Sequence, residues 1–184
     1  MTHSARNAPA SSSAAATTPA ATPADAADAL IETARQHCKA RGTQLTPLRV
    51  DVLRHLARSP GGIKAYDLLT QIQKEKPGFA PMSLYRTLDF LVDNGLVHKV
   101  DATSSFIICE HGHHDRHDHG HPIMLICEGC GQVSEYSGEA VIEALAHATS
   151  RIREQSGFRA RGMEIKGLCQ SCSDNVASHD PSGH

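Results

Sequence analysis

Two Cys-x-x-Cys pairs constrain this chain more than any other feature of its sequence. The four residues are Cys127, Cys130, Cys169 and Cys172. Such spacing directs four thiolates to one point, which suits tetrahedral zinc with Zn–S bonds of about 2.3 Å. A redox pair of the thioredoxin type would stand alone at a helix start in a βαβ pattern, and neither pair does. The pairs therefore predict a closed, structural zinc site in the C-terminal half.

The composition around these cysteines indicates a reducing compartment. No apolar run approaches the roughly 18 residues of a membrane-spanning helix. The first residues lead into no apolar block of the kind that marks a secretory signal. In the reducing cytoplasm, six cysteines favour metal binding over a disulfide framework. We therefore expect a cytoplasmic protein with no membrane partner.

The net charge of −2 conceals two oppositely charged parts. Residues 35–100 hold 11 Lys or Arg and 5 Asp or Glu, a charge of +6. Residues 101–184 hold 6 Lys or Arg and 12 Asp or Glu, a charge of −6, and the first 34 residues contribute −2. This asymmetry indicates that the basic segment meets a polyanion.

The basic segment has the pattern of a winged helix-turn-helix domain. Apolar residues recur at helical spacing over residues 30–41, 47–58, 65–76 and 81–94, and each run ends near Gly or Pro. Pro47 follows Thr46, which is a good N-cap residue. Two short strands are predicted at 96–100 and 106–109, with a polar turn between them. Helices followed closely by a β-hairpin predict DNA binding.

A different pattern follows Cys109. Strands are predicted at 123–126, 133–136 and 159–165, with a long helix ending near Gly157. We expect a winged-helix domain at 25–108 and a small second domain at 109–173, an α+β architecture overall. Residues 1–24 are mostly Ala, Ser, Thr and Pro, which cannot offset their ordering entropy. We expect this segment to be a disordered tail, and residues 174–184 to be a flexible one.

Six His lie within residues 111–121, interleaved with Asp115 and Asp118. The tract is internal and follows the thiol of Cys109, so metal binding is favoured over a solvated loop. Pairing within the predicted hairpin brings His98 toward Cys109. A metal held by His98, Cys109 and a tract His would bridge the two domains, and its occupancy would fix their relative orientation.

In this order, the motifs resemble the ferric uptake regulator (Fur) family of metal-dependent bacterial repressors. The resemblance covers about residues 30–173 and is carried by residues 45–49, 83–88 and 95–97, by the His tract and by both cysteine pairs. The zinc uptake regulators are the most similar members, through residues 65–69, 85–91, 97–100 and 167–169. The resemblance implies a homodimer with a C-terminal α/β dimerisation domain. It also implies repression of zinc-acquisition genes through AT-rich palindromic operators in double-stranded DNA.

The resemblance further implies a regulatory zinc site formed by His98, Cys109, Glu135 and one tract His. The spacing allows His121 or His119 as the fourth ligand, and we prefer His121. Iron-sensing relatives typically carry Glu at the position of Cys109, and a thiolate selects zinc over iron. The expected cofactor is Zn²⁺, one structural and one regulatory ion per chain. A third family site needs a His in the strand before the last cysteine pair, where residues 159–163 offer none.

The helix at 81–94 is the expected recognition element for DNA. Arg86 can bind guanine O6 and N7, and Tyr85 or Tyr66 can contact a thymine methyl group or a phosphate. Ser83 emerges on the same helix away from its apolar stripe. The remaining candidates, for phosphate contact, are Arg49, Lys64, Arg41 and Lys39.

Three alternatives stay open beside this interpretation. The chain could be an iron- or peroxide-sensing member of the same family. A zinc hydrolase using the His tract and Glu135 would need a His-Glu-x-x-His motif, which the sequence lacks. A zinc buffer would not need the basic segment. Because a closed four-cysteine site leaves no position for water, we expect that the protein is not an enzyme.

Overall fold

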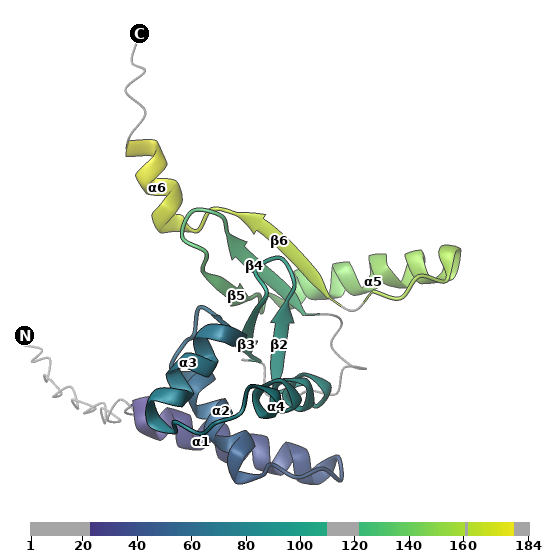
Figure 1. Cartoon of the computed structure of the whole chain (residues 1–184). Helices are drawn as coiled ribbons and strands as arrows, with labels where there is room; N and C mark the ends of the chain where they lie inside the picture. Colours follow the sequence, from purple (N-terminus) through teal and green to yellow (C-terminus); the bar gives the residue numbers. More distant parts are fainter. Residues whose placement is uncertain (1–22, 110–121, 161, 179–184) are drawn as a thin grey trace, which may run out of the picture.

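The computed structural model describes residues 23–109, 122–160 and 162–178. The elements fall into an N-terminal part and a C-terminal part (Figure 1). The N-terminal part comprises α1 (Pro23–Ala40), α2 (Pro47–Ala57), β1 (Ile63–Lys64), α3 (Ala65–Glu75), α4 (Pro81–Asp93), β2 (Val97–Val100) and β3 (Ser105–Ile108). The C-terminal part comprises β4 (Ile123–Cys127), β5 (Val133–Glu135), α5 (Glu139–Ser156), β6 (Met163–Gly167) and α6 (Gln170–Ser178).

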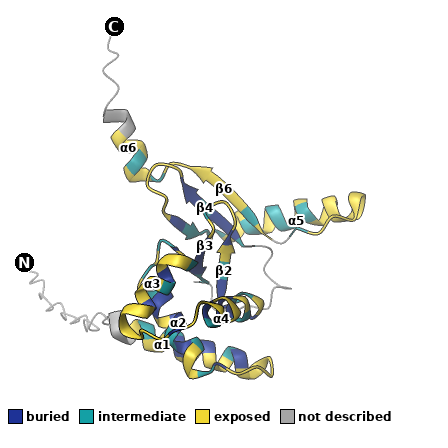
Figure 2. Cartoon of the chain, in the orientation of Figure 1, coloured by how far each residue is buried: buried dark blue, intermediate teal, exposed yellow. Residues whose placement is uncertain are grey.

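The N-terminal part is a winged helix-turn-helix. Its four helices pack around one apolar core, in which Leu53, Leu68, Leu84 and Leu88 are almost completely buried. Burial of each such side chain contributes roughly 1.5–3 kcal/mol. The hairpin β2–β3 closes the core from one side, and Figure 2 shows the buried stripe of each helix facing inward. The apolar residues that recur with helical periodicity therefore form the packing faces of these helices.

Local signals placed the start of α2 and both ends of α4 correctly, whereas α1 begins at Pro23 rather than near residue 30. Pro47 begins α2, and α4 ends before Asn94 and Gly95, whose φ of +72° favours glycine. Thr46 occupies the N-cap position of α2, but its side chain makes no capping hydrogen bond with the described backbone. The strand β1 was not predicted, because two residues carry no periodicity. It pairs with β3 through Ile63 and Phe106.

The C-terminal part is a three-stranded sheet of order β5-β4-β6. The strand β4 pairs antiparallel with β5 and parallel with β6. Parallel pairing of β4 and β6 requires a long crossover, which contains α5. Figure 1 shows α5 extending away from the sheet, and none of its residues, all of which the structure describes, is buried.

Three predicted boundaries are corrected. Strand β6 begins at Met163 rather than at residue 159, because its register follows β4. Residues 174–178, expected in a flexible tail, belong to α6. This helix starts at the second cysteine pair, where the N–H of Ser173 donates to the Cys169 carbonyl. Pro23 and Ala24, expected in the N-terminal tail, begin α1, and proline suits the first turn of a helix. Residues 1–22 and 179–184 lie outside the described residues.

The two parts meet through a second apolar cluster. Val100 and Ile107 from the hairpin pack with residues of the C-terminal sheet. The sheet residues are Met124, Ile126 and Val133. The N–H of Val133 also donates to the Gly61 carbonyl at 3.1 Å. Within the described segments, every helix is too short or too polar to cross a membrane.

Candidate metal centres and nucleic-acid interface

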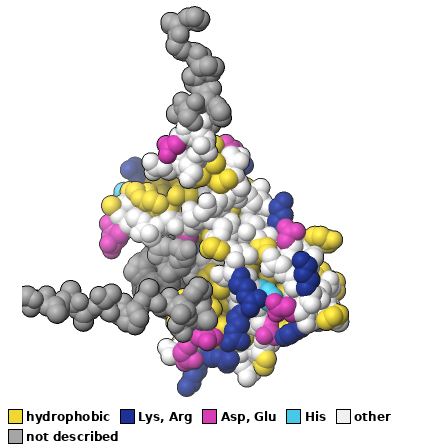
Figure 3. Space-filling view, turned by 90° about the vertical axis from the view of Figure 1, so that its left-hand side faces the viewer, with side chains coloured by type: hydrophobic (Ala, Val, Ile, Leu, Met, Phe, Trp, Pro, Cys, Tyr) yellow, Lys and Arg dark blue, Asp and Glu magenta, His cyan; other side chains and the backbone are white. Residues whose placement is uncertain are grey.

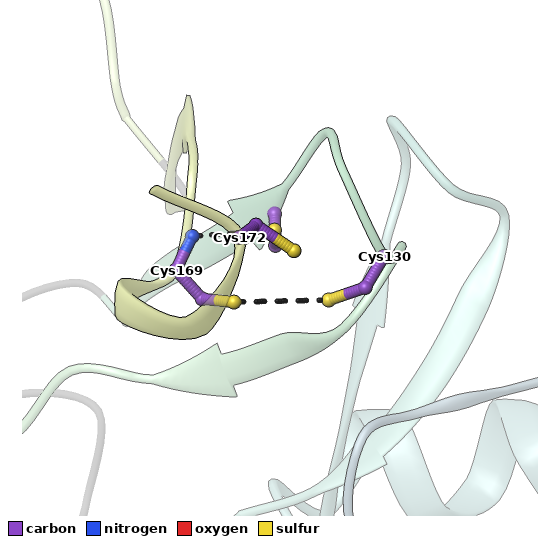
Figure 4. Close-up of side chains that lie close together, drawn as sticks. Cys130, Cys169 and Cys172 are labelled. Carbon is purple, nitrogen blue, oxygen red and sulfur yellow. Dashed lines mark hydrogen bonds between the residues drawn. The ribbon is translucent and has the colours of Figure 1, made fainter. Parts of the chain in front are cut away.

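The two cysteine pairs form two turns that face each other (Figure 4). Cys127 ends β4, and the N–H of Gly131 returns to its carbonyl at 2.8 Å to close the first turn. The positive φ of Gly131, +75°, permits this tight geometry. Cys169 precedes α6, and Cys172 lies in its first turn. The local spacing thus builds each half of the cluster, and the pairing of β4 with β6 places the two halves side by side.

The four sulfur atoms have the separation that a single tetrahedral ion requires. All four lie within 4.8 Å of one another, and Cys130 Sγ and Cys169 Sγ are 3.9 Å apart. Zn–S bonds of about 2.3 Å place the sulfurs of a tetrahedral site about 3.8 Å apart. The four cysteines are free thiols rather than disulfides. The donor set and its geometry therefore fit a closed zinc site.

Backbone donors prepare one of these thiols for metal binding. The N–H groups of Cys169 and Cys130 lower the pKa of the Cys127 thiol to about 6, and the Cys169 N–H lies 3.2 Å from Cys127 Sγ. The sulfurs of Cys169, Cys127 and Cys130 instead raise the pKa of Cys172 to about 12. Four thiolates so close together repel one another unless a cation compensates their charge.

A second cluster lies where the two parts meet. His98 comes from β2, Cys109 directly follows β3, and Glu135 ends β5. One donor atom of each lies within 4.8 Å of the others. The N–H of Cys109 donates to the Leu96 carbonyl, which extends the hairpin by one step beyond β3 and brings Cys109 beside His98. The expected approach of His98 to Cys109 and the implied proximity of Glu135 are both present in this hinge cluster.

The hinge cluster is half-buried, and one of its nitrogen atoms lacks a well-directed hydrogen bond. The side chains of His98 and Glu135 are 13% and 7% exposed, with Nε2 of His98 3.3 Å from Oε1 of Glu135. Nε2 nevertheless has no well-directed hydrogen bond to any described residue. Nitrogen and oxygen ligands at about 2.0–2.1 Å from zinc are about 3.3–3.4 Å apart in a tetrahedron. A buried nitrogen at this distance from a carboxylate oxygen, without a well-directed hydrogen bond, suits a shared metal ion.

Protonation competes with metal binding at His98. Burial alone lowers the pKa of His98, but hydrogen bonding and charge interactions with Cys109 and Glu135 outweigh it and raise the pKa to about 9. These same neighbours would stabilise any cation in the hinge cluster. The proposed fourth ligand, His121 or His119, lies outside the described residues. The structure thus brings together three of the four residues proposed for the regulatory site.

The residues proposed for DNA contact lie on or next to the helices of the N-terminal part, with Lys64 at the end of β1. Tyr66 at the start of α3 is 75% exposed, and Tyr85 on α4 is 47% exposed. Arg86 and Lys64 are also exposed, whereas Ser83 is half-buried. In the view of Figure 3, most Lys and Arg side chains lie over the lower part of the molecule, where the helices are. Asp and Glu side chains lie among them in this view.

Arg49 is engaged within the N-terminal part. Its guanidinium stacks 3.3 Å from the centroid of the Phe90 ring, and it donates a hydrogen bond to the Gln44 carbonyl. Met82, which was not among the predicted contacts, is 62% exposed on α4. Met82 lies three residues before Tyr85, so the two side chains share one face of the helix. This spacing in the sequence is the signal that could have identified Met82. Arg41 and Lys39 are exposed near the end of α1.

Comparisons with known proteins agree with this geometry. The profile of the Ferric uptake regulator family matches residues 40–166. The zinc uptake regulation protein of Escherichia coli (strain K12) is 36% identical over 154 residues, which cover 83% of this chain and 86% of that protein. The peroxide operon regulator of Bacillus subtilis (strain 168) is 30% identical over 153 residues, covering 78% and 93%. A solved structure of a zinc uptake regulator complexed with zinc and DNA superposes with a TM-score of 0.70 and 35% identity, covering 82% and 97%.

Proposed function

The chain belongs to the ferric uptake regulator family, and from this premise we propose that it is a zinc-responsive transcriptional repressor. It binds palindromic operators of zinc-uptake genes as a zinc-loaded homodimer. The observation that carries the proposal is the hinge cluster of His98, Cys109 and Glu135, which joins the DNA-reading helices to the C-terminal sheet. The relatives named for zinc uptake regulation support the same function.

Two zinc ions per chain are proposed, with different roles. Cys127, Cys130, Cys169 and Cys172 would hold the structural ion, since four thiolates leave no open position. His98, Cys109 and Glu135, with His121 preferred over His119, would hold the regulatory ion. Zinc bound there would supply a charge that compensates Glu135 and the Cys109 thiolate and joins residues of both parts. The mixed N, O and S donor set favours zinc over iron.

The chain's own residues would transmit occupancy of the hinge to DNA. His98 and Cys109 are fixed to the hairpin, and Glu135 is fixed to β5. When these three side chains are held together, the winged-helix domain (25–108) and the dimerisation domain (109–173) take one relative orientation. In the homodimer, the two copies of α4 then present Tyr85 and Arg86 to successive major grooves, with Tyr66 of α3 as a further contact. Ser83, Lys64 and Arg49 are the further proposed contacts, with Arg49 also holding Phe90.

Unpartnered apolar surface on the C-terminal part supports the homodimer. The helix α5 buries no residue within the chain, yet Val141 and Ile152 are exposed by 43% and 48%. Phe158 and Ile165 nearby are exposed by 64% and 48%. An amphipathic helix without a packing partner is stable when a second copy covers its apolar side. We propose that α5 and β6 form this dimer surface.

We further infer that the protein is not an enzyme and that it acts in the cytoplasm. Four cysteine donors converge on the structural site, so a zinc ion bound there would have no position for a reactive water. A repressor must reach DNA in the compartment where thiols stay reduced. An iron- or peroxide-sensing role is the second candidate, supported by the 30% identity to the Bacillus subtilis regulator. The Cys109 thiol in the hinge cluster favours zinc over this alternative.

Metal-resolved DNA binding tests the proposed function. The protein is stripped to its tightly held zinc and titrated with zinc, iron or manganese in the presence of AT-rich palindromic duplexes. Zinc should produce a sequence-specific shift at the lowest free concentration. Equal activation by iron would remove the zinc assignment, and the absence of any metal-dependent shift would remove the repressor assignment altogether.

A further inference from the structure

The turn of the β2–β3 hairpin is held by a carboxylate from the C-terminal sheet. The backbone N–H of Asp101 donates to Oε1 of Glu164 at 2.6 Å, and the N–H of Ala102 donates to Oε2 at 3.1 Å. Glu164 lies on β6, while both donors belong to the hairpin of the N-terminal part. Each oxygen of one carboxylate thus accepts one donor across the boundary between the two parts.

The chemistry of this contact favours a fixed turn. Bonds to an ionised acceptor are about twice as strong as bonds between neutral groups. The Asp101 carboxylate, which would otherwise repel Glu164, is paired with Lys99 at 2.8 Å. Within the turn, Ser104 has a φ of +52°, a conformation that non-glycine residues rarely adopt. An outside acceptor that satisfies two consecutive N–H groups holds the turn in this shape.

Glu164 contacts the turn of the hairpin, whereas the hinge cluster lies at its open end. His98 lies near the start of β2, and Asp101 follows its last residue. Three residues of extended strand separate the two contacts by about 10 Å. Between them, Val100 and Ile107 pack on the C-terminal sheet. A single contact would leave the hairpin free to pivot, whereas two separated contacts define its direction.

We propose that Glu164 is a positioning residue for operator binding. Its two hydrogen bonds fix the hairpin turn to the C-terminal sheet, which we call the clamp. The hairpin then connects the two parts rigidly, so that metal binding at the hinge cluster sets the orientation of α4. Clamping also turns the hairpin tip toward the C-terminal sheet and away from DNA, and Figure 1 shows β2 and β3 running from the helices toward β4 and β6. The inference rests on the proposed function, because operator binding is its readout.

The test compares Glu164→Ala and Glu164→Gln with the unaltered protein and with Asp174→Asn. Asp174→Asn removes one negative charge from an exposed position on α6 and serves as the control. Three quantities are measured on full-length, zinc-loaded protein: bound zinc, operator affinity with and without regulatory zinc, and radius of gyration from small-angle X-ray scattering. The loss of two charge-assisted hydrogen bonds should lower zinc-dependent operator affinity by at least about tenfold in Glu164→Ala.

The structure predicts a smaller loss for Glu164→Gln, whose amide keeps one acceptor oxygen. The radius of gyration should increase for Glu164→Ala, while its zinc content and that of the Asp174→Asn control stay unchanged. If Glu164 has only a structural role, Glu164→Ala lowers the melting temperature but does not change the ratio of the operator affinities measured with and without regulatory zinc. That result overturns the proposal. If the unaltered protein shows no zinc-dependent binding, the proposed function itself fails. Unaltered binding by Glu164→Ala, beside a responsive parent protein, refutes only the clamp.

Discussion

Nε2 of His98 lies 3.3 Å from Oε1 of Glu135, although the two side chains come from different sheets. Both are largely buried, and burying charge is costly unless it is paired. Without metal, a proton on the imidazole compensates the charge of Glu135. With metal, the ion takes over that role, so proton and metal compete for the same nitrogen.

The zinc affinity of the hinge cluster should therefore rise with pH. Burial alone lowers the pKa of His98, but hydrogen bonds and charges of Cys109 and Glu135 raise it to about 9. Below that pH, zinc must displace a proton, and the apparent affinity should fall at least about tenfold per pH unit. Competition with a chromophoric zinc chelator measures the slope, with His147→Ala on α5 as the control. An affinity independent of pH would contradict the protonated state of His98.

The same pKa makes the folding stability of the metal-free protein decrease with pH, opposite to the zinc affinity. A His pKa raised from 6.5 to about 9 stabilises the fold, and this contribution is complete below pH 6.5. It is lost as the pH rises through about 9. Chemical denaturation of protein stripped of hinge zinc should show decreasing stability over this range. The loss should be absent in His98→Ala.

Replacing Cys109 by Ser should separate the two proposed zinc ions. The hydroxyl is a much weaker zinc ligand than a thiolate, so hinge zinc and zinc-dependent operator binding should be lost. The four-cysteine cluster does not include Cys109 and should keep its ion. Zinc content by mass spectrometry should fall by one ion per chain, with Cys38→Ser as a control for a cysteine outside both clusters. Normal operator binding by Cys109→Ser would show that the regulatory site lies elsewhere.

A methyl group at Gly129 should disturb the four-cysteine cluster. A Cβ there would lie 3.0 Å from Cys172 Sγ and 3.2 Å from a methyl carbon of Leu168. Such crowding costs about 1–3 kcal/mol. Gly129→Ala should lower the melting temperature and speed the release of zinc to a chelator. Gly167→Ala is the matched control, because a Cβ there has no described atom within 4 Å. Equal zinc release from both variants would exclude crowding as the cause.

Arg86 should carry part of the specificity for operator sequence. A bidentate contact with guanine is worth about 1–3 kcal/mol of discrimination. Arg86→Ala should weaken operator binding by that amount and reduce the preference over unrelated DNA. Lys74→Ala removes an exposed positive charge at the far end of α3 and is the control. If both variants weaken binding equally and without loss of preference, Arg86 acts on phosphate alone.

Much of the fold follows from local signals in the sequence. The helices α2 and α4 begin at Pro47 and Pro81, and the stop at Asn94 and Gly95 was predicted, because these signals act over a few residues. The strand β1 and the helix α6 were not predicted. The two residues of β1 form a strand only because β3 lies beside them. The helix α6 grows from the turn that carries Cys169 and Cys172, a short polar segment with a weak apolar pattern.

By itself, the sequence determined the four-cysteine cluster, the winged helix-turn-helix and the approach of His98 to Cys109. Each depends on spacing within one motif or one hairpin. Only the tertiary structure decided that Arg49 stacks on Phe90 and that Glu164 accepts the N–H groups of the hairpin turn. Both contacts join residues far apart in the chain. Packing of α2 and α4 around the N-terminal core brings Arg49 to Phe90. The second apolar cluster and the parallel pairing of β4 with β6 bring Glu164 to the hairpin turn.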